Sequence, residues 1–426
     1  MRNGIMVFVL VIIVGGSVLS AADPEPKPPV FKTDRGVYPD WPGPLPEPPK
    51  LPKAGGETFV DPDFGTTIMR VTDEADGDCK HRYSYLHTFN KDSTRFYINC
   101  GGKAVLYSFD PVAFRIKGKV PLFRDNPLGG GKVHWDHTQW SADNPDLMYC
   151  HEGLRLYSYG VAEQKYTLLK DFTGIFGQGN LWQMSKSLDD KTFAFTVDKP
   201  DERVAVRFTA WSRDKDKILL NEKANPEFDE VQIDKTGRYL VIKTGQTGRD
   251  HVILVRIADL GTGKTWDLTD FEPDWAPGHS DNGHGTVVAV SSHDCDGLGP
   301  SLTLRKLEDP HNFIHILRWP KDWTQSFHIS MLADDEDWAL VSSYTTKPPL
   351  SKGLFHDEIF QVTTKGPGFV RRLAHHHSVR REFWDEPRAN ISRDGRFVTF
   401  TSNWGGSTRH DVFILRVPDE FVPKKE

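Results

Sequence analysis

Histidine and acidic side chains cluster at a few places in the sequence where they could transfer protons or bind a metal. The segment HTQWSADNPDLMYCHEG covers residues 137–153, and another histidine precedes it at His134. Histidine titrates nearest to neutral pH, so a neutral imidazole can accept a proton or ligate a metal ion. These residues can form a site only if the fold brings them together with residues from distant parts of the chain.

The elements that must position these residues follow from a repeated pattern. Near the C-terminus, ANISRDGRFVTFTSNWGGSTRHDVFILRVP contains three short apolar strands separated by an Asp-Gly turn and a Gly-Gly turn. This pattern is typical of antiparallel hairpins. It recurs upstream at a spacing of about 45 residues, which gives seven units. We therefore predict an all-β fold, a seven-bladed β-propeller of four-stranded blades.

The two ends of the repeat region are incomplete in complementary ways. TTIMRVTD, at residues 66–73, reads as the last strand of a blade that lacks its first three strands, and the final unit stops after its third strand. We expect these pieces to pair, because pairing closes the ring and removes two unprotected sheet edges. The propeller then spans residues 56–420, followed by a charged tail at 421–426.

The residues before the propeller are predicted to have separate roles. Residues 1–22 join Arg2 to an apolar run and then to small residues, which predicts a secretory signal peptide, although an uncleaved anchor has the same pattern. Residues 23–55 are rich in proline and predict a semi-rigid, unpaired linker. No later apolar run reaches about 18 residues, so the mature chain is expected to lack a membrane span. We predict an extracytoplasmic location, either periplasmic or secreted.

The composition excludes one class of partner and leaves other questions open. The net charge of −6 is not concentrated in blocks, so we predict no nucleic-acid partner. Four cysteines are too few for a disulfide scaffold, and they can pair in three ways, of which a Cys79–Cys100 bridge is one possibility. Nothing in the sequence predicts the oligomeric state.

In a propeller, the first strand of each blade lines the central channel, so residues just before each Asp turn should meet at one rim. Polar or ionisable side chains occupy this position in every predicted blade. The candidate catalytic residues are His134, His137 and His328, and the candidate ligand-binding residues are Gln139, Trp182, Gln183, Glu386 and Arg388. Structural roles remain open for all of them. Histidines can hydrogen-bond neighbouring blades, the tryptophan can pack between blades, and Glu386 and Arg388 can form an inter-blade salt bridge.

A metal site is a second possibility. In GHSDNGH, His279 and His284 lie five residues apart, a spacing that lets a loop bend both imidazoles inward. They are candidate ligands of a divalent metal, with Mn, Ca and Zn all open. The triple at residues 375–377 falls in a polar connection and is expected to be a solvated loop. No HExxH or GxSxG motif is present, so zincin-type chemistry and acyl hydrolysis have no support.

Two stretches resemble the oligogalacturonate lyases, seven-bladed propellers that cleave short pectin-derived uronides by β-elimination. NPDLMYCHEG is similar to that family's second-blade segment, and EPRANISRDGRFVTFTSNWGG is similar to its closing blade. The resemblance implies a histidine base and a manganese ion. It also implies that His279 matches a fifth-blade metal ligand, while Phe383, Glu386 and Arg388 replace the family's Gln, His and His. Gln183 falls near the family's base.

These substitutions leave two functions open. The first is a carbohydrate-active lyase that cleaves acidic (uronate) oligosaccharides by β-elimination. It would use His134, His137 or His328 as a rearranged base, and Arg388 would pair with the uronate carboxylate. The alternative is a non-catalytic propeller that binds a glycan, a peptide or an envelope partner. The expected ligand is an acidic oligosaccharide or another small molecule at the rim of the central channel.

Overall fold

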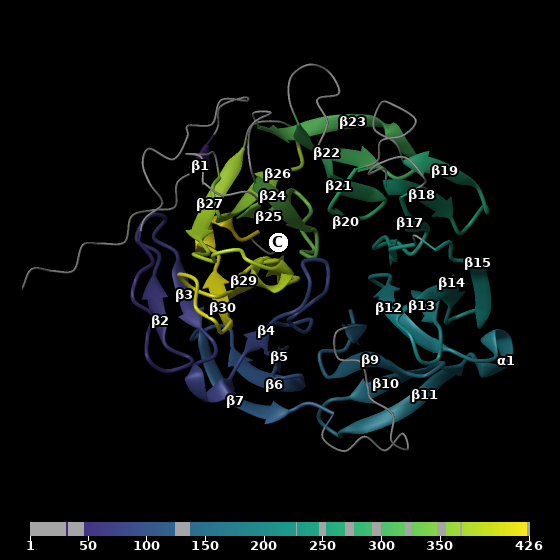
Figure 1. Ribbon diagram of the computed structural model, residues 1–426, viewed down its shortest axis with the longest axis horizontal. Helices are drawn as coiled ribbons and strands as arrows, with labels where there is room; N and C mark the ends of the chain where they lie inside the picture. Colours follow the sequence, from purple (N-terminus) through teal and green to yellow (C-terminus); the bar gives the residue numbers. More distant parts are fainter. Residues whose placement is uncertain are drawn as a thin grey trace, which may run out of the picture.

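Seven antiparallel sheets surround a central axis in the computed structural model. It describes residues 31–32, 47–123, 137–226, 228–246, 253–268, 277–291, 300–319, 325–346, 355–366 and 369–423. The sheets follow one another around the ring in chain order and form blades 1 to 7 (Figure 1). The prediction of an all-β, seven-bladed propeller is therefore confirmed.

In the first four blades, the strands run outward from the axis in chain order. Blade 1 contains β4 (Cys79–Lys80), β5 (Arg95–Cys100), β6 (Lys103–Asp110) and β7 (Arg115–Pro121), and blade 2 contains β8 (Gln139–Trp140), β9 (Leu147–Glu152), β10 (Arg155–Gly160) and β11 (Lys165–Asp171). Blade 3 contains β12 (Asn180–Lys186), β13 (Thr192–Asp198), β14 (Ala205–Ser212) and β15 (Lys217–Lys223), and blade 4 contains β16 (Glu230–Ile233), β17 (Tyr239–Gln246), β18 (Ile253–Asp259) and β19 (Thr265–Leu268).

The remaining blades carry the irregular additions. Blade 5 contains β20 (Ser280–Asn282), β21 (Thr286–Ser291), β22 (Ser301–Lys306) and β23 (Asp309–Arg318), and blade 6 contains β24 (Gln325–Ser330), β25 (Trp338–Thr345), β26 (Glu358–Thr363), β27 (Val370–His375) and β1 (Phe31–Lys32). Blade 7 contains β28 (Asn390–Ile391), β29 (Phe397–Ser402), β30 (Asp411–Arg416), β3 (Thr67–Arg70) and β2 (Thr58–Val60). The short helices are η1 (Glu74–Asp76), α1 (Thr173–Phe176), η3 (Phe383–Asp385) and η4 (Asp419–Phe421).

Aspartate side chains fix the turns that follow the innermost strands. Asp394 accepts hydrogen bonds from Ser392 Oγ at 2.7 Å and from the backbone N of Arg396 at 3.1 Å. Gly395 follows with a φ of +72°, a conformation that glycine adopts without steric cost. Such side-chain bonds hold the backbone in a turn and set the register of the hairpin. The turn pattern in the sequence therefore locates each blade-leading segment beside the axis.

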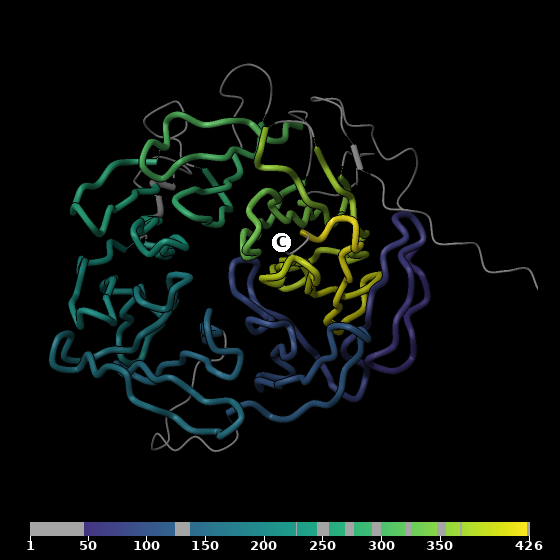
Figure 2. The backbone as a smooth tube through the Cα atoms, turned by 180° about the vertical axis from the view of Figure 1, so that it is seen from behind, coloured from purple at the N-terminus to yellow at the C-terminus, as the bar shows by residue number. Residues whose placement is uncertain are grey.

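The ring closes by pairing of the first and last parts of the propeller. β3 pairs antiparallel with β30, from Thr67 opposite Arg416 to Arg70 opposite Phe413. In Figure 2 the purple N-terminal strands lie beside the yellow C-terminal ones. Arg70 also forms a buried ion pair with Asp411, at 2.8 Å between Nη2 and Oδ2. The predicted closure is confirmed, and β2 adds a fifth strand outside it.

Aromatic side chains fill the seam where blade 7 meets blade 1. The ring of Phe397 lies 5.2 Å from Phe109, 5.6 Å from Phe89 and 5.9 Å from Phe114, measured between centroids. Phe397 is 1% exposed. Its side chain therefore joins the last blade to the first through apolar contact, in addition to the backbone pairing of β3 with β30.

The segment expected to be an unpaired linker has contacts with the propeller. Phe31 pairs with Arg371 and Lys32 with Val370 at the outer edge of blade 6. Closer to the propeller, Trp404 Nε1 donates to the carbonyl oxygen of Pro49 at 2.9 Å. Residues 1–22, the expected signal segment, lie outside the described residues. None of the helices in the described part of the chain has the length and apolar character that crossing a bilayer requires.

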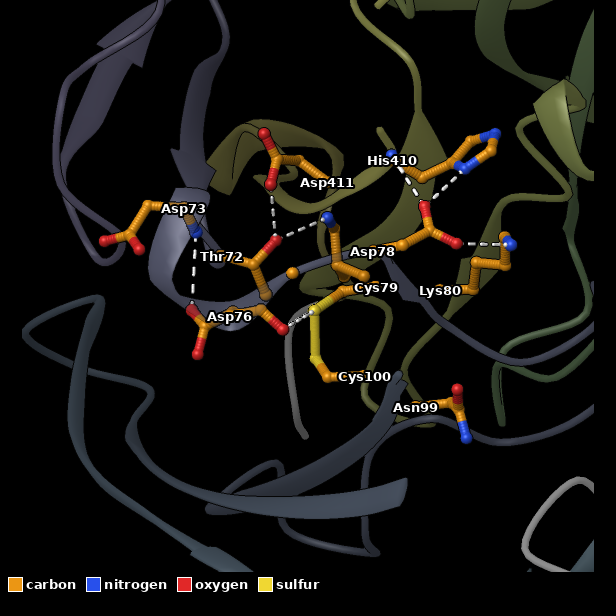
Figure 3. Close-up of a disulfide and its surroundings, with 12 residues drawn as sticks. Thr72, Asp73, Asp76, Asp78, Cys79, Lys80, Asn99, Cys100, His410 and Asp411 are labelled. Carbon is orange, nitrogen blue, oxygen red and sulfur yellow. Dashed lines mark hydrogen bonds and ion pairs between the residues drawn. A yellow bond between two sulfur atoms is a disulfide. The ribbon is translucent and has the colours of Figure 1, made fainter. Parts of the chain in front are cut away.

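One of the possible cysteine pairings is present. Cys79 of β4 and Cys100 of β5 form a disulfide within blade 1 (Figure 3). Beside it, His410 and Lys80 both contact the carboxylate of Asp78. Cys150 is a buried free thiol. The disulfide covalently ties the first strand of blade 1 to the second at the point where the ring closes.

Candidate functional site

The segments that lead the blades meet around a cavity of 470 Å³ at the axis. They contribute side chains from six of the seven blades. Tyr83 and Tyr85 come from blade 1, Gln183 from blade 3, Asp229, Glu230 and Lys243 from blade 4, His279 from blade 5, Ser326 from blade 6 and Phe383 from blade 7. The fold thus gathers polar residues that are far apart in the sequence at one place, as the position of the Asp turns predicted.

Two histidines form a stacked pair at this cavity. His279 precedes β20 and lines the cavity, and His328 of β24 lies directly behind it, with 4.5 Å between ring centroids and 28° between ring planes. The ring of Tyr344 contacts both histidines, with its centroid 4.9 Å from that of His328 and 6.5 Å from that of His279, and the ring of Tyr83 meets His328 in a T-shaped contact at 5.2 Å. His328 is 1% exposed. Aromatic rings therefore surround His328, and one of them, Tyr83, also lines the cavity.

The two imidazoles are neutral at pH 7. Burial lowers the pKa of His279 to about 4 and, together with the neighbouring His279, lowers the pKa of His328 well below its ordinary value. His279 Nδ1 lies 2.8 Å from the carbonyl oxygen of Phe327. Because a carbonyl can only accept, Nδ1 carries the hydrogen and Nε2 keeps its lone pair. His279 thus presents a fixed tautomer with a proton-accepting nitrogen.

Glu386 lies next to this pair. One carboxylate oxygen accepts a hydrogen bond from Arg380 Nε at 2.7 Å, and the other is 3.7 Å from His328 Nε2. The second distance is too long for a hydrogen bond. Burial raises the pKa of Glu386, and the contact with Arg380 opposes that rise. Glu386 is therefore held by Arg380, and it forms no inter-blade salt bridge with Arg388 within the described residues.

Arg388 is a buried cation at the start of blade 7. It is 2% exposed, and its guanidinium carbon lies 4.5 Å from the ring centre of Trp384 and 5.0 Å from that of Phe383. Nη2 donates to the carbonyl oxygen of Trp384 at 3.1 Å, whereas Nη1 is buried without an acceptor among the described residues. Burial lowers the pKa of Arg388 to about 10, so the group stays protonated at neutral pH.

The opposite wall carries a compact charged network. Glu230 accepts a hydrogen bond from the Tyr85 hydroxyl, forms an ion pair with Lys243, and also accepts from Gln232 Nε2 at 3.2 Å. Burial alone would raise the pKa of Glu230, but the contacts with Lys243 and Tyr85 lower it overall. Lys243 belongs to the second strand of blade 4 and reaches Glu230 because the two residues are paired in register. The charges of this network cancel.

The polar residues of blades 2 and 3 lie beside the same cavity. Gln183 has a φ of +42° within a β-bulge between Trp182 and Ser185, and it lines both the large cavity and a 60 Å³ pocket next to it. His137 and Gln139 line the small pocket. Gln139 donates to the carbonyl oxygen of Met184, and the His137 ring lies 4.5 Å from Trp182. These residues join two blades as well as lining the pocket.

The two residues expected to share a metal do not lie together. His279 precedes β20, whereas His284 follows it, so they stand at opposite ends of that inner strand. His284 is exposed, and its Nδ1 lies 2.8 Å from Glu336 Oε1. Within the described ranges, no three or more His, Cys, Asp or Glu side chains are grouped so that they could hold a metal ion. His134 lies outside the described residues.

The expectation of a solvated loop at residues 375–377 is wrong. His375 and His376 are each 1% exposed. The backbone N of His375 donates to Asp61 at 3.2 Å, and His376 Nε2 lies 2.8 Å from the carbonyl oxygen of Ser343. The chain leaves β27 at this point and passes under the N-terminal segment, which shields these side chains. Sequence reasoning also missed Tyr83 and Lys243, although Tyr83 occupies the leading segment of blade 1.

Neutral buried histidines are expected to make the fold sensitive to acid. Burial lowers the pKa of His279 and His356 to about 4, of His81, His376 and His377 to about 3, and of His87 and His328 well below the ordinary value. Below pH 6.5 these histidines bind protons in the unfolded chain but stay neutral in the folded protein. The free energy of unfolding therefore falls as the pH drops from 6.5 toward 4.

Six carboxyls act in the opposite direction, because burial raises the pKa of Asp281 to about 7 and that of Asp357 to about 6, and it also raises the pKa of Asp61, Asp198, Asp229 and Glu386. The histidines outnumber them, so we expect a net loss of about 1.4 kcal/mol per pH unit for each excess proton bound by the unfolded chain. Urea denaturation at pH 7, 6 and 5 measures this slope. A free energy of unfolding that stays level or rises toward pH 5 would contradict the expected protonation states.

The fold and the axial cavity define the chain as a seven-bladed β-propeller with a polar site at the central channel. Its particular architecture is that of the oligogalacturonate lyases. An oligogalacturonate lyase solved in complex with manganese has a TM-score of 0.64 and 13% identity, over 86% of this chain and 99% of that chain. The oligogalacturonate lyase from Vibrio parahaemolyticus has a TM-score of 0.62 and 12% identity, over 86% and 100%. No family model and no curated protein matches the sequence.

Proposed function

We propose that this propeller binds an acidic oligosaccharide at the axial cavity and cleaves it by β-elimination. The observation that carries the proposal is the tautomer of His279, a neutral imidazole at the cavity wall whose Nδ1 is bound to a backbone carbonyl and whose Nε2 can accept a proton. The shared fold with oligogalacturonate lyases supports uronate as the substrate class. A seven-bladed fold alone would not, because propellers serve many functions.

The reaction needs a base, an acid and a group that neutralises the sugar carboxylate. His279 Nε2 takes the proton from the carbon beside the carboxylate. The electron pair of that C–H bond forms a carbon–carbon double bond, and the bond to the glycosidic oxygen breaks. The leaving oxygen takes a proton from the Tyr83 phenol, which burial keeps protonated by raising its pKa. The imidazolium proton then returns to the phenolate by way of solvent.

His328 remains a second candidate base. Its two ring nitrogens have no hydrogen-bond partner among the described residues, but the ring lies behind His279 and Tyr83 and does not itself line the cavity. We assign it a supporting role in which it stacks on His279. Glu386, 3.7 Å from His328, would stabilise positive charge that develops on the histidine pair.

An extracytoplasmic location is part of the proposal. The apolar N-terminal run, expected to be a signal peptide, supports it. The Cys79–Cys100 disulfide supports it as well, because such bonds persist in oxidising compartments. Secretion of a tagged full-length chain into the periplasm or medium tests this placement.

The enzyme assay is direct. The purified protein is incubated with di-, tri- and tetragalacturonate, and the ultraviolet absorbance of the unsaturated product is followed while mass spectrometry identifies the fragments. We expect products with an unsaturated non-reducing end from these acids and none from the neutral galactose oligomers. Products without the double bond would contradict elimination.

A binding-only propeller is the second candidate, and the residues at the positions of the family's ligands favour it. The resemblance noted in the sequence places Phe383, Glu386 and Arg388 at those positions, and it places Gln183, which cannot take a proton, near the family's base. Calorimetric binding of trigalacturonate without any cleavage product would support this second function. Absence of both binding and cleavage would overturn both.

A further inference from the structure

The residues at the axial site do not fit the manganese that the oligogalacturonate lyase neighbour holds. A divalent cation needs several free imidazole or carboxylate ligands. In this chain Glu386 is bound to Arg380, and no three or more His, Cys, Asp or Glu side chains in the described part of the chain are grouped so that they could hold a metal ion. The positive charge of Arg388 is close enough to lower the pKa of His328. A second cation in this place would be repelled.

Arg388 is also a cation without a carboxylate partner. Within the described residues, no carboxylate oxygen lies within ion-pairing distance of its guanidinium, while the two neighbouring carboxylates are engaged elsewhere. Glu386 pairs with Arg380, and Asp385 is bound by His410 and Asn403. An unpaired buried charge is costly. This free-energy cost is offset when an anionic ligand binds and pairs with the guanidinium of Arg388.

The guanidinium lies just behind the cavity wall: Arg388 is not among the lining residues, and the ring of Phe383, which does line the cavity, lies between. Its Nη1 is buried and has no acceptor in the described structure. The rings of Phe383 and Trp384, 46% and 44% exposed, lie against it, and Phe383 lines the cavity. The backbone of Arg388 has a φ of +43°, a strained conformation of the kind that persists where function requires it. Two other carboxylates, Glu230, which is paired with Lys243, and Asp229, belong to blade 4 and line the same cavity.

We propose that Arg388 takes the place of the metal and binds the substrate carboxylate through Nη1 when the half-exposed Phe383 ring moves aside, so that the site works without a divalent cation. The inference rests on the proposed function for its choice of uronate, but it concerns binding and does not require cleavage. Charge-assisted donation from a guanidinium to a carboxylate is among the stronger hydrogen bonds in proteins. It would neutralise the carboxylate and thereby ease removal of the neighbouring proton.

The test is calorimetric titration of the full chain with trigalacturonate, before and after treatment with EDTA, and again with added Mn²⁺. We expect the same affinity within about twofold in all three states, because a guanidinium contact needs no metal. Loss of binding in EDTA that Mn²⁺ restores would overturn the proposal. This measurement uses the unaltered protein, so it does not depend on the folding of any variant.

Two substitutions examine the residue itself. Arg388→Gln should weaken trigalacturonate binding roughly tenfold or more, and Arg388→Lys should weaken it less, because the charge remains but the planar donor is lost. The methyl-esterified trisaccharide should bind wild type and Arg388→Gln alike. Arg115→Gln, at an exposed site on β7, serves as the control. Unchanged trigalacturonate affinity in Arg388→Gln would overturn the proposal.

The outcomes separate this inference from the proposed elimination. Arg388-dependent binding that survives EDTA, with no unsaturated product, supports the inference and overturns cleavage. Unsaturated product that requires Mn²⁺ supports cleavage and overturns the inference. Circular dichroism and thermal unfolding of each variant identify any loss of binding that comes from misfolding.

Discussion

Replacing His279 with alanine is expected to lower kcat for uronide cleavage by about 10²- to 10⁴-fold, the usual contribution of a general base. The ring lines the cavity and is oriented by the carbonyl oxygen of Phe327, so its loss removes the proton acceptor together with the stacking contact on His328. The absorbance of the unsaturated product measures the rate. Trigalacturonate affinity, measured in parallel, should change much less than kcat.

A second substitution distinguishes the two stacked histidines. His328→Phe keeps a flat ring against His279 and Tyr344 but cannot accept a proton, so it should reduce kcat only modestly if His279 is the base. An exposed histidine on the outer strand of blade 5, His311, provides the matched control through His311→Ala. If His328→Phe abolishes cleavage while His279→Ala does not, the assignment of the base to His279 is wrong.

Replacing Phe397 with alanine is expected to lower the free energy of unfolding by about 4 kcal/mol, in the range measured for buried aromatic side chains. The ring is 1% exposed and lies among Phe89, Phe109 and Phe114 at the seam between the last and first blades. Truncation removes these contacts and leaves a cavity that the surrounding strands fill only partly. Urea denaturation, monitored by tryptophan fluorescence, measures the change.

Phe369→Ala is the control for this prediction, because Phe369 is 45% exposed and should contribute less than about 1 kcal/mol. Phe397→Leu should fall between the two. If Phe397→Ala costs no more than Phe369→Ala, the seam does not contribute to stability as its packing implies. A change in the denaturant slope of Phe397→Ala would instead indicate that the seven-bladed propeller unfolds in more than one step.

The fold could be predicted because its determinants are local. Each blade is marked by apolar strands and by turns such as the one at Asp394 and Gly395, whose bonds involve neighbours in the sequence. The closure could be predicted too, because a lone fourth strand and a blade missing its fourth strand complement each other. The pairing of β3 with β30 follows from that count, whereas its register, with Thr67 opposite Arg416, is seen only in the structure.

The site was harder to predict because its partners lie across strands. The repeat pattern places His279 and Gln183 in blade-leading segments, and both line one cavity. No pattern in the sequence links Glu230 to Lys243, which meet through the register of two adjacent strands. Spacing alone likewise could not show that His279 and His284 are separated by an inner strand. A five-residue interval in an extended strand carries two side chains apart, whereas the same interval in a loop can bring them together.

The closure of the ring has a consequence for how the chain matures. β3 precedes the other six blades in the chain, yet its partner β30 follows them, so blade 7 cannot be completed until all six have been synthesised. Until then β3 has no neighbour on that side, and the six blades form an open arc.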